Sequence, residues 1–191
     1  MNTANKITIF RILLIPLLII LLIVEKIPNR FFFALIIFLV ASFSDHLDGK
    51  IARKLNQTTD FGKFLDPIAD KMLVMSAFIC FVELKLISSV PVIIILLREF
   101  LVTSIRLVAF NSGKVIAANI WGKIKTVSQL IAISEILMSQ WLIRGVLNLT
   151  EENLVLIQMI NNVFVGLAVF LTVFSGYIYV KENLNFIKNK K

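Results

Sequence analysis

The stretch that decides the fold is SDHLDGKIARKLNQTTDFGKFLDPIADK, which occupies residues 44–71. Long apolar runs lie on both sides of it. Burying a carboxylate in apolar surroundings is costly unless the charge is paired or bound to a metal, so acidic residues in this place need a partner. The stretch fits the pattern D-x2-D-G-x2-A-R-x8-G-x3-D-x3-D, whose fixed positions are Asp45, Asp48, Gly49, Ala52, Arg53, Gly62, Asp66 and Asp70.

The composition of the 191 residues predicts a single membrane domain that spans residues 1–191. Hydrophobic residues make up 58% of the chain and the mean hydropathy is +0.89, whereas soluble domains are only about 45–50% apolar. The one cysteine, Cys80, excludes an internal disulfide, and we expect it to be a small core residue. We expect no cleavable signal peptide, because no small-residue cleavage site follows the first apolar run.

Six apolar runs, taken with their flanks, are long enough to cross a bilayer, since a spanning helix needs about 20 residues. We expect these helices over residues 5–24, 31–53, 62–82, 90–110, 120–143 and 154–180. The predicted fold is therefore an all-α integral membrane protein with six transmembrane helices. An even number of spans places both termini on the same side of the lipid bilayer.

The distribution of positive charge predicts which side that is. Fourteen of the 20 Lys and Arg residues fall on the side of the termini, and four fall on the other side. The positive-inside rule therefore places both termini and the aspartate stretch in the cytoplasm. We interpret the lysine-rich tail after residue 180 as an orientation and lipid-headgroup signal, and we expect no nucleic-acid partner.

Helical spacing brings the four aspartates of the pattern together in pairs. Asp45 and Asp48 are three residues apart on one predicted helix, and Asp66 and Asp70 are four apart on the next, so each pair shares one helix face. An antiparallel helix pair can turn these two faces toward each other. Four carboxylates so close together cannot all stay ionised without cations, and Mg²⁺ or Mn²⁺ suits an all-oxygen site. Zinc is not expected, because no His/Cys cluster is present.

The other residues of the pattern have two interpretations each. Gly49 and Ala52 leave a hollow on the helix surface that fits either close helix packing or a ligand pocket. Arg53 is either a donor to a diphosphate or an ordinary charge at the cytoplasmic edge. His46, the only histidine, occupies a variable position, and we expect it to be solvated or packed rather than catalytic.

Three further polar patches lie in the predicted helices: NKITIFRILLIP at the start of the first, LREFLVTSIR within the fourth and WGKIKT at the start of the fifth. Cations that converge on the carboxylate site would suit a phosphate-bearing ligand. The alternative is ion pairing, for example of Arg98 with Glu99, but adjacent helix residues do not face each other, so we expect Arg98 to serve an anion. The residues of these patches are Asn5, Thr8, Arg11, Arg98, Arg106, Lys123 and Lys125.

The pattern on residues 45–70 resembles the signature of the CDP-alcohol phosphatidyltransferases, and no position of the signature is missing. The resemblance implies six transmembrane helices, usually in a homodimer, with a site open to the cytoplasm. It also implies that the protein moves a phosphatidyl or related group from a CDP-alcohol to a hydroxyl acceptor and releases CMP.

The same resemblance implies a role for each residue of the pattern. Two divalent ions, Mg²⁺ or Mn²⁺, would be held by Asp45, Asp48, Asp66 and Asp70. Asp70 would also be the general base that takes the proton of the acceptor hydroxyl. The CDP-lipid would lie against Asp48, Gly49, Ala52, Arg53 and Gly62, with Asn5 and Thr8 as peripheral contacts.

Shorter patterns, NxITxFRxxLIP, GKFLDPxADK, REFxVTxxR and GKxKT, resemble the bacterial branch of this family that makes phosphatidylglycerophosphate. Together with the main pattern they cover much of residues 1–130. This likeness implies CDP-diacylglycerol as donor and sn-glycerol 3-phosphate as acceptor, at the cytoplasmic face of the cell membrane. The acceptor phosphate would be held by Arg98, Arg106, Lys123 and Lys125.

Three alternatives remain open from the sequence. The acceptor could be that of another branch of the family, which makes cardiolipin, phosphatidylserine or phosphatidylinositol phosphate. A divalent-cation transporter would also carry intramembrane carboxylates. A membrane scaffold without catalytic activity is the third possibility.

Overall fold

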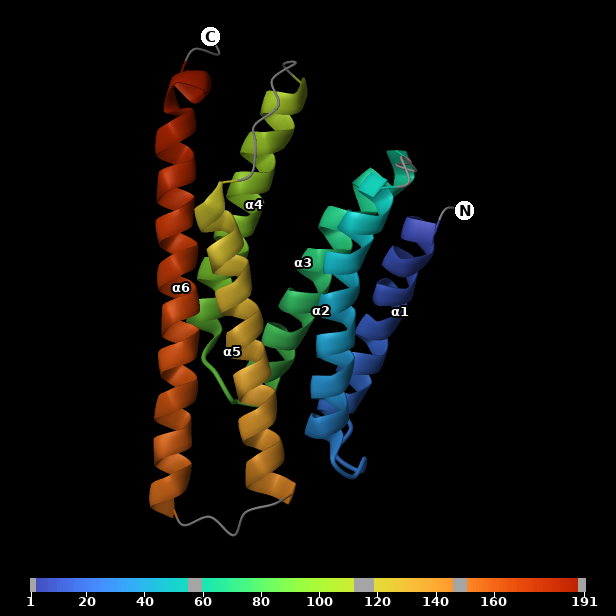
Figure 1. Ribbon diagram of the computed structural model, residues 1–191. Helices are drawn as coiled ribbons and strands as arrows, with labels where there is room; N and C mark the ends of the chain where they lie inside the picture. The colour runs from blue at the N-terminus through green and yellow to red at the C-terminus, as the bar shows by residue number, and fades with distance from the viewer. Residues whose placement is uncertain (1–2, 55–59, 112–118, 146–150, 189–191) are drawn as a thin grey trace.

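A computed structural model describes the backbone of residues 3–54, 60–111, 119–145 and 151–188. Within these ranges it does not describe the side chains of residues 3–7, 45–54, 60–68, 70, 110–111, 145, 151 and 184–188. The described residues form helices and no strand, which confirms the all-α prediction (Figure 1). The helices are α1 (Thr3–Ile23), α2 (Arg30–Lys54), α3 (Asp60–Glu83), α4 (Ser89–Asn111), α5 (Ile120–Gly145) and α6 (Glu151–Lys188).

Most helix boundaries lie close to those expected from hydropathy, and α6 is the exception. The sequence predicts that this helix ends at residue 180, whereas it continues to Lys188, about 12 Å farther at 1.5 Å per residue. The segment KENLNFIK after residue 180 is polar but contains no helix-breaking residue, so only its hydropathy changes there. Two described segments are long and apolar enough to cross a membrane by length and composition, Ile120–Arg144 and Glu152–Asn183.

The helices form two groups of three that meet along the middle of the molecule (Figure 1). In one group α1 packs against α2 and α3, and in the other α6 packs against α4 and α5. Helix α5 joins the groups by contacting α2 and α3, and α4 also contacts α3. The two groups diverge toward the end of the bundle at which α1 begins and α6 ends (Figure 1).

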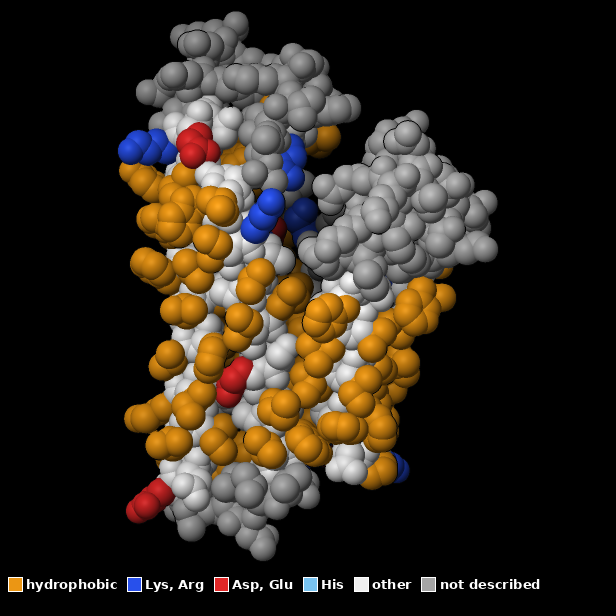
Figure 2. All heavy atoms as spheres, in the orientation of Figure 1, with side chains coloured by type: hydrophobic (Ala, Val, Ile, Leu, Met, Phe, Trp, Pro, Cys, Tyr) orange, Lys and Arg blue, Asp and Glu red, His pale blue; other side chains and the backbone are white. Residues whose placement is uncertain are grey.

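A continuous apolar core joins all six helices. Its fully buried side chains include Leu18 of α1, Phe38 of α2, Phe78 of α3, Ile95 of α4 and Ile133 of α5, and Val165 of α6 is nearly as buried. The outward faces of the helices also carry many large apolar side chains (Figure 2). An apolar exterior of this extent is expected where lipid, rather than water, surrounds the protein. Cys80 is buried, as the sequence predicts.

Hydrogen bonds close the two described connections at the end of the bundle opposite the termini. After α3, the backbone N–H of Leu86 donates to the carbonyl of Phe81 at 2.9 Å, and that of Lys85 donates to Val82 at 3.0 Å. Lys85 has a φ of 57°, so this is a Schellman ending with a lysine where glycine is usual. After α1, the Arg30 guanidinium donates to the carbonyl of Leu22 at 2.9 Å.

Neighbouring residues on α3 provide a test of the core. Phe78→Ala should lower the free energy of unfolding by about 3 kcal/mol, because it empties a fully buried site. Ile79→Ala should cost less than about 1 kcal/mol, because that side chain is 54% exposed and faces lipid or detergent. Thermal unfolding of both variants in one detergent measures the difference, and equal losses would place the core elsewhere.

Candidate functional site

The backbone places the four predicted metal ligands at one end of the bundle. Positions Asp45 and Asp48 lie in the last turns of α2, and Asp66 and Asp70 lie in the first turns of α3. Asp48 is six residues before the end of α2 and Asp66 six residues after the start of α3, so both positions lie about 9 Å into their helices. Helices α2 and α3 are in contact.

The side chains of these four aspartates lie outside the described residues, so metal binding stays a prediction. Among the side chains that are described, no group of three or more His, Cys, Asp or Glu residues could hold a metal ion. The side chains of Asn5, His46, Ala52 and Arg53 are likewise not described. Of Gly49 and Gly62 only the backbone positions are described, so their predicted roles stay predictions. Thr8 and Arg11 are described, and both are buried in the bundle with 1% of their surface exposed.

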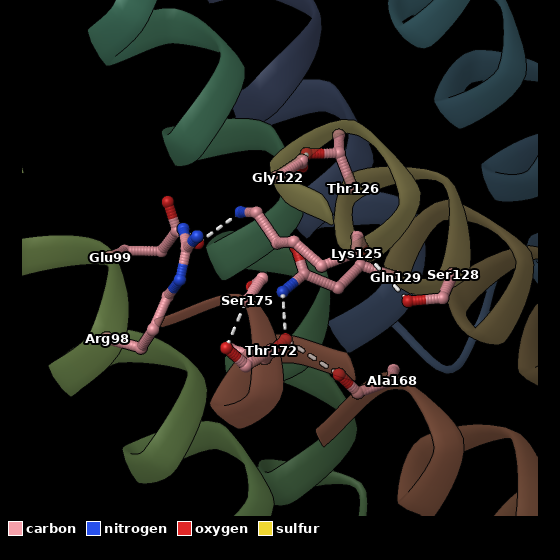
Figure 3. A network of polar contacts seen from close by, with 10 residues as sticks. All are labelled: Arg98, Glu99, Gly122, Lys125, Thr126, Ser128, Gln129, Ala168, Thr172 and Ser175. Carbon is pink, nitrogen blue, oxygen red and sulfur yellow. Dashed lines mark hydrogen bonds and ion pairs between the residues drawn. The ribbon is translucent and has the colours of Figure 1, made fainter. Parts of the chain in front are cut away.

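Two of the four predicted phosphate-binding cations are brought together by a carboxylate. The Lys125 ammonium, from α5, and the Arg98 guanidinium, from α4, both donate to Oε1 of Glu99, the arginine at 3.2 Å (Figure 3). Glu99 and Lys125 are buried and Arg98 is nearly so, with 9–11% of each side chain exposed. The expectation that Arg98 and Glu99 would not pair is therefore wrong. The long arginine side chain folds back toward a carboxylate that Lys125 also holds across the helix interface.

The other two predicted cations are not part of this cluster. Lys123 is exposed near the start of α5. Arg106 is exposed two turns beyond Arg98 on α4, and its guanidinium carbon lies 6.0 Å from the ring centre of Tyr179 on α6. Basic side chains also line a hollow in the face shown in Figure 2, close to the end at which the termini lie. Of the four predicted phosphate-binding cations, two therefore lie together in the bundle and two are exposed.

A second polar layer, contributed by α5 and α6, lies next to the Glu99 cluster. Gln129 Nε2 donates to Thr172 Oγ1 at 3.0 Å, and Thr172 Oγ1 donates to the carbonyl of Ala168 at 2.6 Å (Figure 3). Ser175 Oγ donates to the carbonyl of Thr172 at 2.9 Å. Because these buried groups are hydrogen-bonded, they can hold α5 and α6 together at the level of Lys125.

The sequence indicated no role for Glu135 and Asn161, and Glu99, which lies inside the pattern REFxVTxxR, was considered only as an ion-pair alternative for Arg98. Glu135 of α5 faces Asn161 of α6, whose amide nitrogen, oriented toward the carboxylate, lies 2.9 and 2.6 Å from its two oxygens. Contacts of this kind join residues far apart in the chain, so spacing along one helix does not indicate them.

Gly176 of α6 makes room for Arg98. A Cβ atom at this glycine would lie 2.9 Å from Arg98 Cγ, closer than carbon atoms normally approach, and Cγ is near the backbone, where it has little freedom to move. Gly166 lies on the same helix and has nothing within 4 Å of such a Cβ. The two glycines therefore form a matched pair for substitution.

We expect Gly176→Ala to destabilise the protein by about 1–3 kcal/mol, because the added methyl group must displace the Arg98 side chain. Gly166→Ala should be neutral or stabilise by up to about 1 kcal/mol, since alanine favours a helix over glycine. Thermal unfolding of both variants in detergent tests this. Loss of stability in Gly166→Ala alone would contradict the described packing of Arg98.

Comparison with known proteins agrees with the pattern on residues 45–70. The family model described as CDP-alcohol phosphatidyltransferase matches residues 1–174. The chain is 42% identical to the CDP-diacylglycerol–glycerol-3-phosphate 3-phosphatidyltransferase of Bacillus subtilis, over 98% of this chain and 97% of that protein. It is 35% identical to the protein of that name from Rickettsia bellii over 94% of each chain, and 35% identical to that of Escherichia coli over 71% of this chain and 76% of the other. The chain therefore belongs to the CDP-alcohol phosphatidyltransferase family, whose members are membrane-bound enzymes.

Proposed function

We propose that this enzyme transfers the phosphatidyl group of CDP-diacylglycerol to sn-glycerol 3-phosphate, which yields phosphatidylglycerophosphate and CMP. The observation that carries the proposal is the similarity over nearly the whole chain to proteins named for this reaction. The buried pair of Arg98 and Lys125 supports a phosphate-bearing acceptor, because guanidinium and ammonium groups are strong donors to phosphate oxygens.

The donor end of the proposed site lies between α2 and α3. Two divalent ions, Mg²⁺ or Mn²⁺, would be held there by Asp45, Asp48, Asp66 and Asp70, whose backbone positions lie at matching depths in adjacent helices. Bound ions of this kind neutralise a diphosphate and stabilise the departing CMP. All four donors are carboxylate oxygens, which is the ligand chemistry that these ions prefer.

Protein groups would supply the remaining steps. We assign Asp70 as the general base that takes the proton of the acceptor hydroxyl as the new phosphodiester bond forms. Arg53 would contact the diphosphate of the CDP-lipid. The cytidine and the rest of this substrate would occupy the space around Gly49, Ala52 and Gly62, with Asn5 and Thr8 at the periphery of the site.

The acceptor end would use the cations of α4 and α5. Arg98 and Lys125 lie in the bundle interior and would grip the phosphate, whereas the exposed Arg106 and Lys123 would attract it from water. Holding both substrates in one orientation is the remaining contribution to rate, since the lipid stays in the membrane and the acceptor arrives from solution.

We also propose that all six helices cross the cell membrane, with the site and both termini on the cytoplasmic side, and that the enzyme is a homodimer. The beginning of α1 and the end of α6 lie at the same end of the bundle, as a cytoplasmic location of both termini requires (Figure 1). The excess of Lys and Arg on that side supports the orientation.

Two alternatives are less well supported. A phosphatidylserine synthase would not need buried cations for its acceptor. Cardiolipin and phosphatidylinositol-phosphate synthases belong to the same family, and an acceptor assay is needed to distinguish them from the proposed enzyme. A divalent-cation transporter would have to pass cations beside Arg98 and Lys125, whose charges oppose them.

The acceptor assay is the direct test. Purified protein given CDP-diacylglycerol should release CMP with sn-glycerol 3-phosphate at a rate at least about 100-fold above that with serine, which lacks the phosphate, because a lost polar contact is heavily penalised in a buried site. The same assay with inositol phosphate decides between the two phosphate-bearing acceptors. Thin-layer chromatography of labelled lipid identifies the product. Preferential consumption of serine would overturn the acceptor assignment, and metal flux into liposomes without CMP release would favour the transporter.

The aspartates provide a second test with a matched control in the same stretch. Asp70→Asn should lower the rate of CMP release at least about 100-fold, since a general base contributes about 10²–10⁴-fold. Asp60→Asn, outside the pattern at the start of α3, should stay within about twofold of the parent, because asparagine is as well tolerated as aspartate at a helix start. Chelator should abolish activity and Mg²⁺ or Mn²⁺ should restore it. Full activity in chelator would refute the metal assignment.

A further inference from the structure

A negative charge lies inside the part of the site proposed to bind an anion. Glu99 accepts hydrogen bonds from Lys125 Nζ and Arg98 NH1 through one oxygen, Oε1 (Figure 3). The carboxylate is as buried as the two cations, with 10% of its side chain exposed. A carboxylate in this place repels a phosphate, so its presence requires a physical reason.

Charge balance in the unliganded protein provides one reason. Two cations buried side by side without a counter-ion would each lose their hydration and repel each other. Glu99 reduces the net charge of the three groups from +2 to +1 by pairing with both. The remaining positive charge suits a phosphate ligand, whereas a charge of +2 would attract any small anion.

Geometry provides the second reason. The Arg98 guanidinium has five N–H donors, and its contact with Glu99 occupies NH1, which leaves donors for a ligand. Glu99 joins α4 to α5, and Gln129 and Thr172 join α5 to α6 in the adjacent layer, so the two cations are attached to a cross-linked part of the bundle. Figure 3 shows the second oxygen of Glu99 directed away from both cations.

We propose that Glu99 is a positioning residue, which fixes Arg98 and Lys125 in the arrangement that orients the phosphate of the acceptor and keeps the site from binding anions indiscriminately. This inference rests on the proposed function, because it takes the acceptor to be a phosphorylated alcohol. Preorganised cations lose little freedom on binding and so favour one orientation of the ligand. The repulsion by Glu99 disfavours anions that cannot use that orientation.

The test uses the full-length protein in detergent and the substitution Glu99→Gln. The specificity constant kcat/KM for sn-glycerol 3-phosphate should fall at least tenfold, while KM for CDP-diacylglycerol stays within twofold. Inorganic phosphate, in contrast, should bind and inhibit at least threefold more tightly, because the net charge of the cluster rises. If Glu99 were needed only for folding, Glu99→Gln would weaken the binding of both substrates and of phosphate together, and that outcome would overturn the proposal.

Two further variants isolate the mechanism. Because Glu99 acts partly through Lys125, the double variant Glu99→Gln/Lys125→Gln should lose less kcat/KM than the product of the two single losses, whereas fully multiplied losses would contradict positioning. Glu99→Asp keeps the charge, so phosphate inhibition should stay near that of the parent while kcat/KM still falls. Tighter phosphate binding in Glu99→Asp would contradict the charge argument, and this variant serves if Glu99→Gln does not fold.

The control is Glu135→Gln. Glu135 lies on α5, away from the proposed site, and its carboxylate contacts Asn161 of the neighbouring helix α6. Its phosphate inhibition should match that of the parent, and a change equal to that of Glu99→Gln would overturn the proposal. Calorimetric binding of inorganic phosphate does not depend on turnover. If phosphate binding responds to Glu99→Gln as stated but the parent protein releases no CMP, the proposed reaction is wrong and the role of Glu99 in the anion site stands.

Discussion

A charge buried in an apolar helical bundle must be compensated, and this constraint links the two ends of the proposed site. On α4 and α5 the compensation is visible, because Glu99 lies between Arg98 and Lys125 and all three side chains are buried. On α2 and α3 four aspartates lie in turns near the helix ends, and we propose that cations between them compensate their charges. We therefore interpret the proposed site as two halves. The aspartates of α2 and α3 would bind cations, and the basic residues of α4 and α5 would bind an anion.

Contacts between the helices hold these two halves of the proposed site in one bundle. Helix α5 carries Lys125 and contacts α2 and α3, so the helix with one of the proposed acceptor-binding cations also touches the helices in which the four aspartates lie. The core from Leu18 to Val165 and the polar layer of Gln129 and Thr172 fix these helices along their length. The bundle diverges only toward the end with both termini, where a water-soluble acceptor and a membrane lipid would meet (Figure 1).

Much of the fold could be predicted because apolar runs and polar connections alternate clearly along the chain. The start of α5 at residue 120 and the burial of Cys80 agree with expectation. The end of α6 was misjudged, because hydropathy reports where a chain suits lipid and not where its backbone stops being helical. The Arg98–Glu99 pair was misjudged because spacing along one helix does not include Lys125, which holds the carboxylate from another helix.

The part of the site that depends on one continuous motif can be predicted from the sequence, since spacing alone places Asp45 with Asp48 and Asp66 with Asp70, and metal binding by these residues stays a prediction. The parts built from separate helices were not, because the clearance at Gly176 and the contact of Glu135 with Asn161 depend on how α4, α5 and α6 pack. Membership of the family shows the reaction class, and the packing around Glu99 suggests how a particular acceptor is held.

Anomalous X-ray scattering from Mn²⁺, in crystals of the full chain grown with CDP-diacylglycerol, tests the central claim most directly. The account predicts peaks between α2 and α3, within about 2.5 Å of carboxylate oxygens from Asp45, Asp48, Asp66 and Asp70. Peaks at another place, or a bound CDP-lipid with no metal among these four residues, would contradict it.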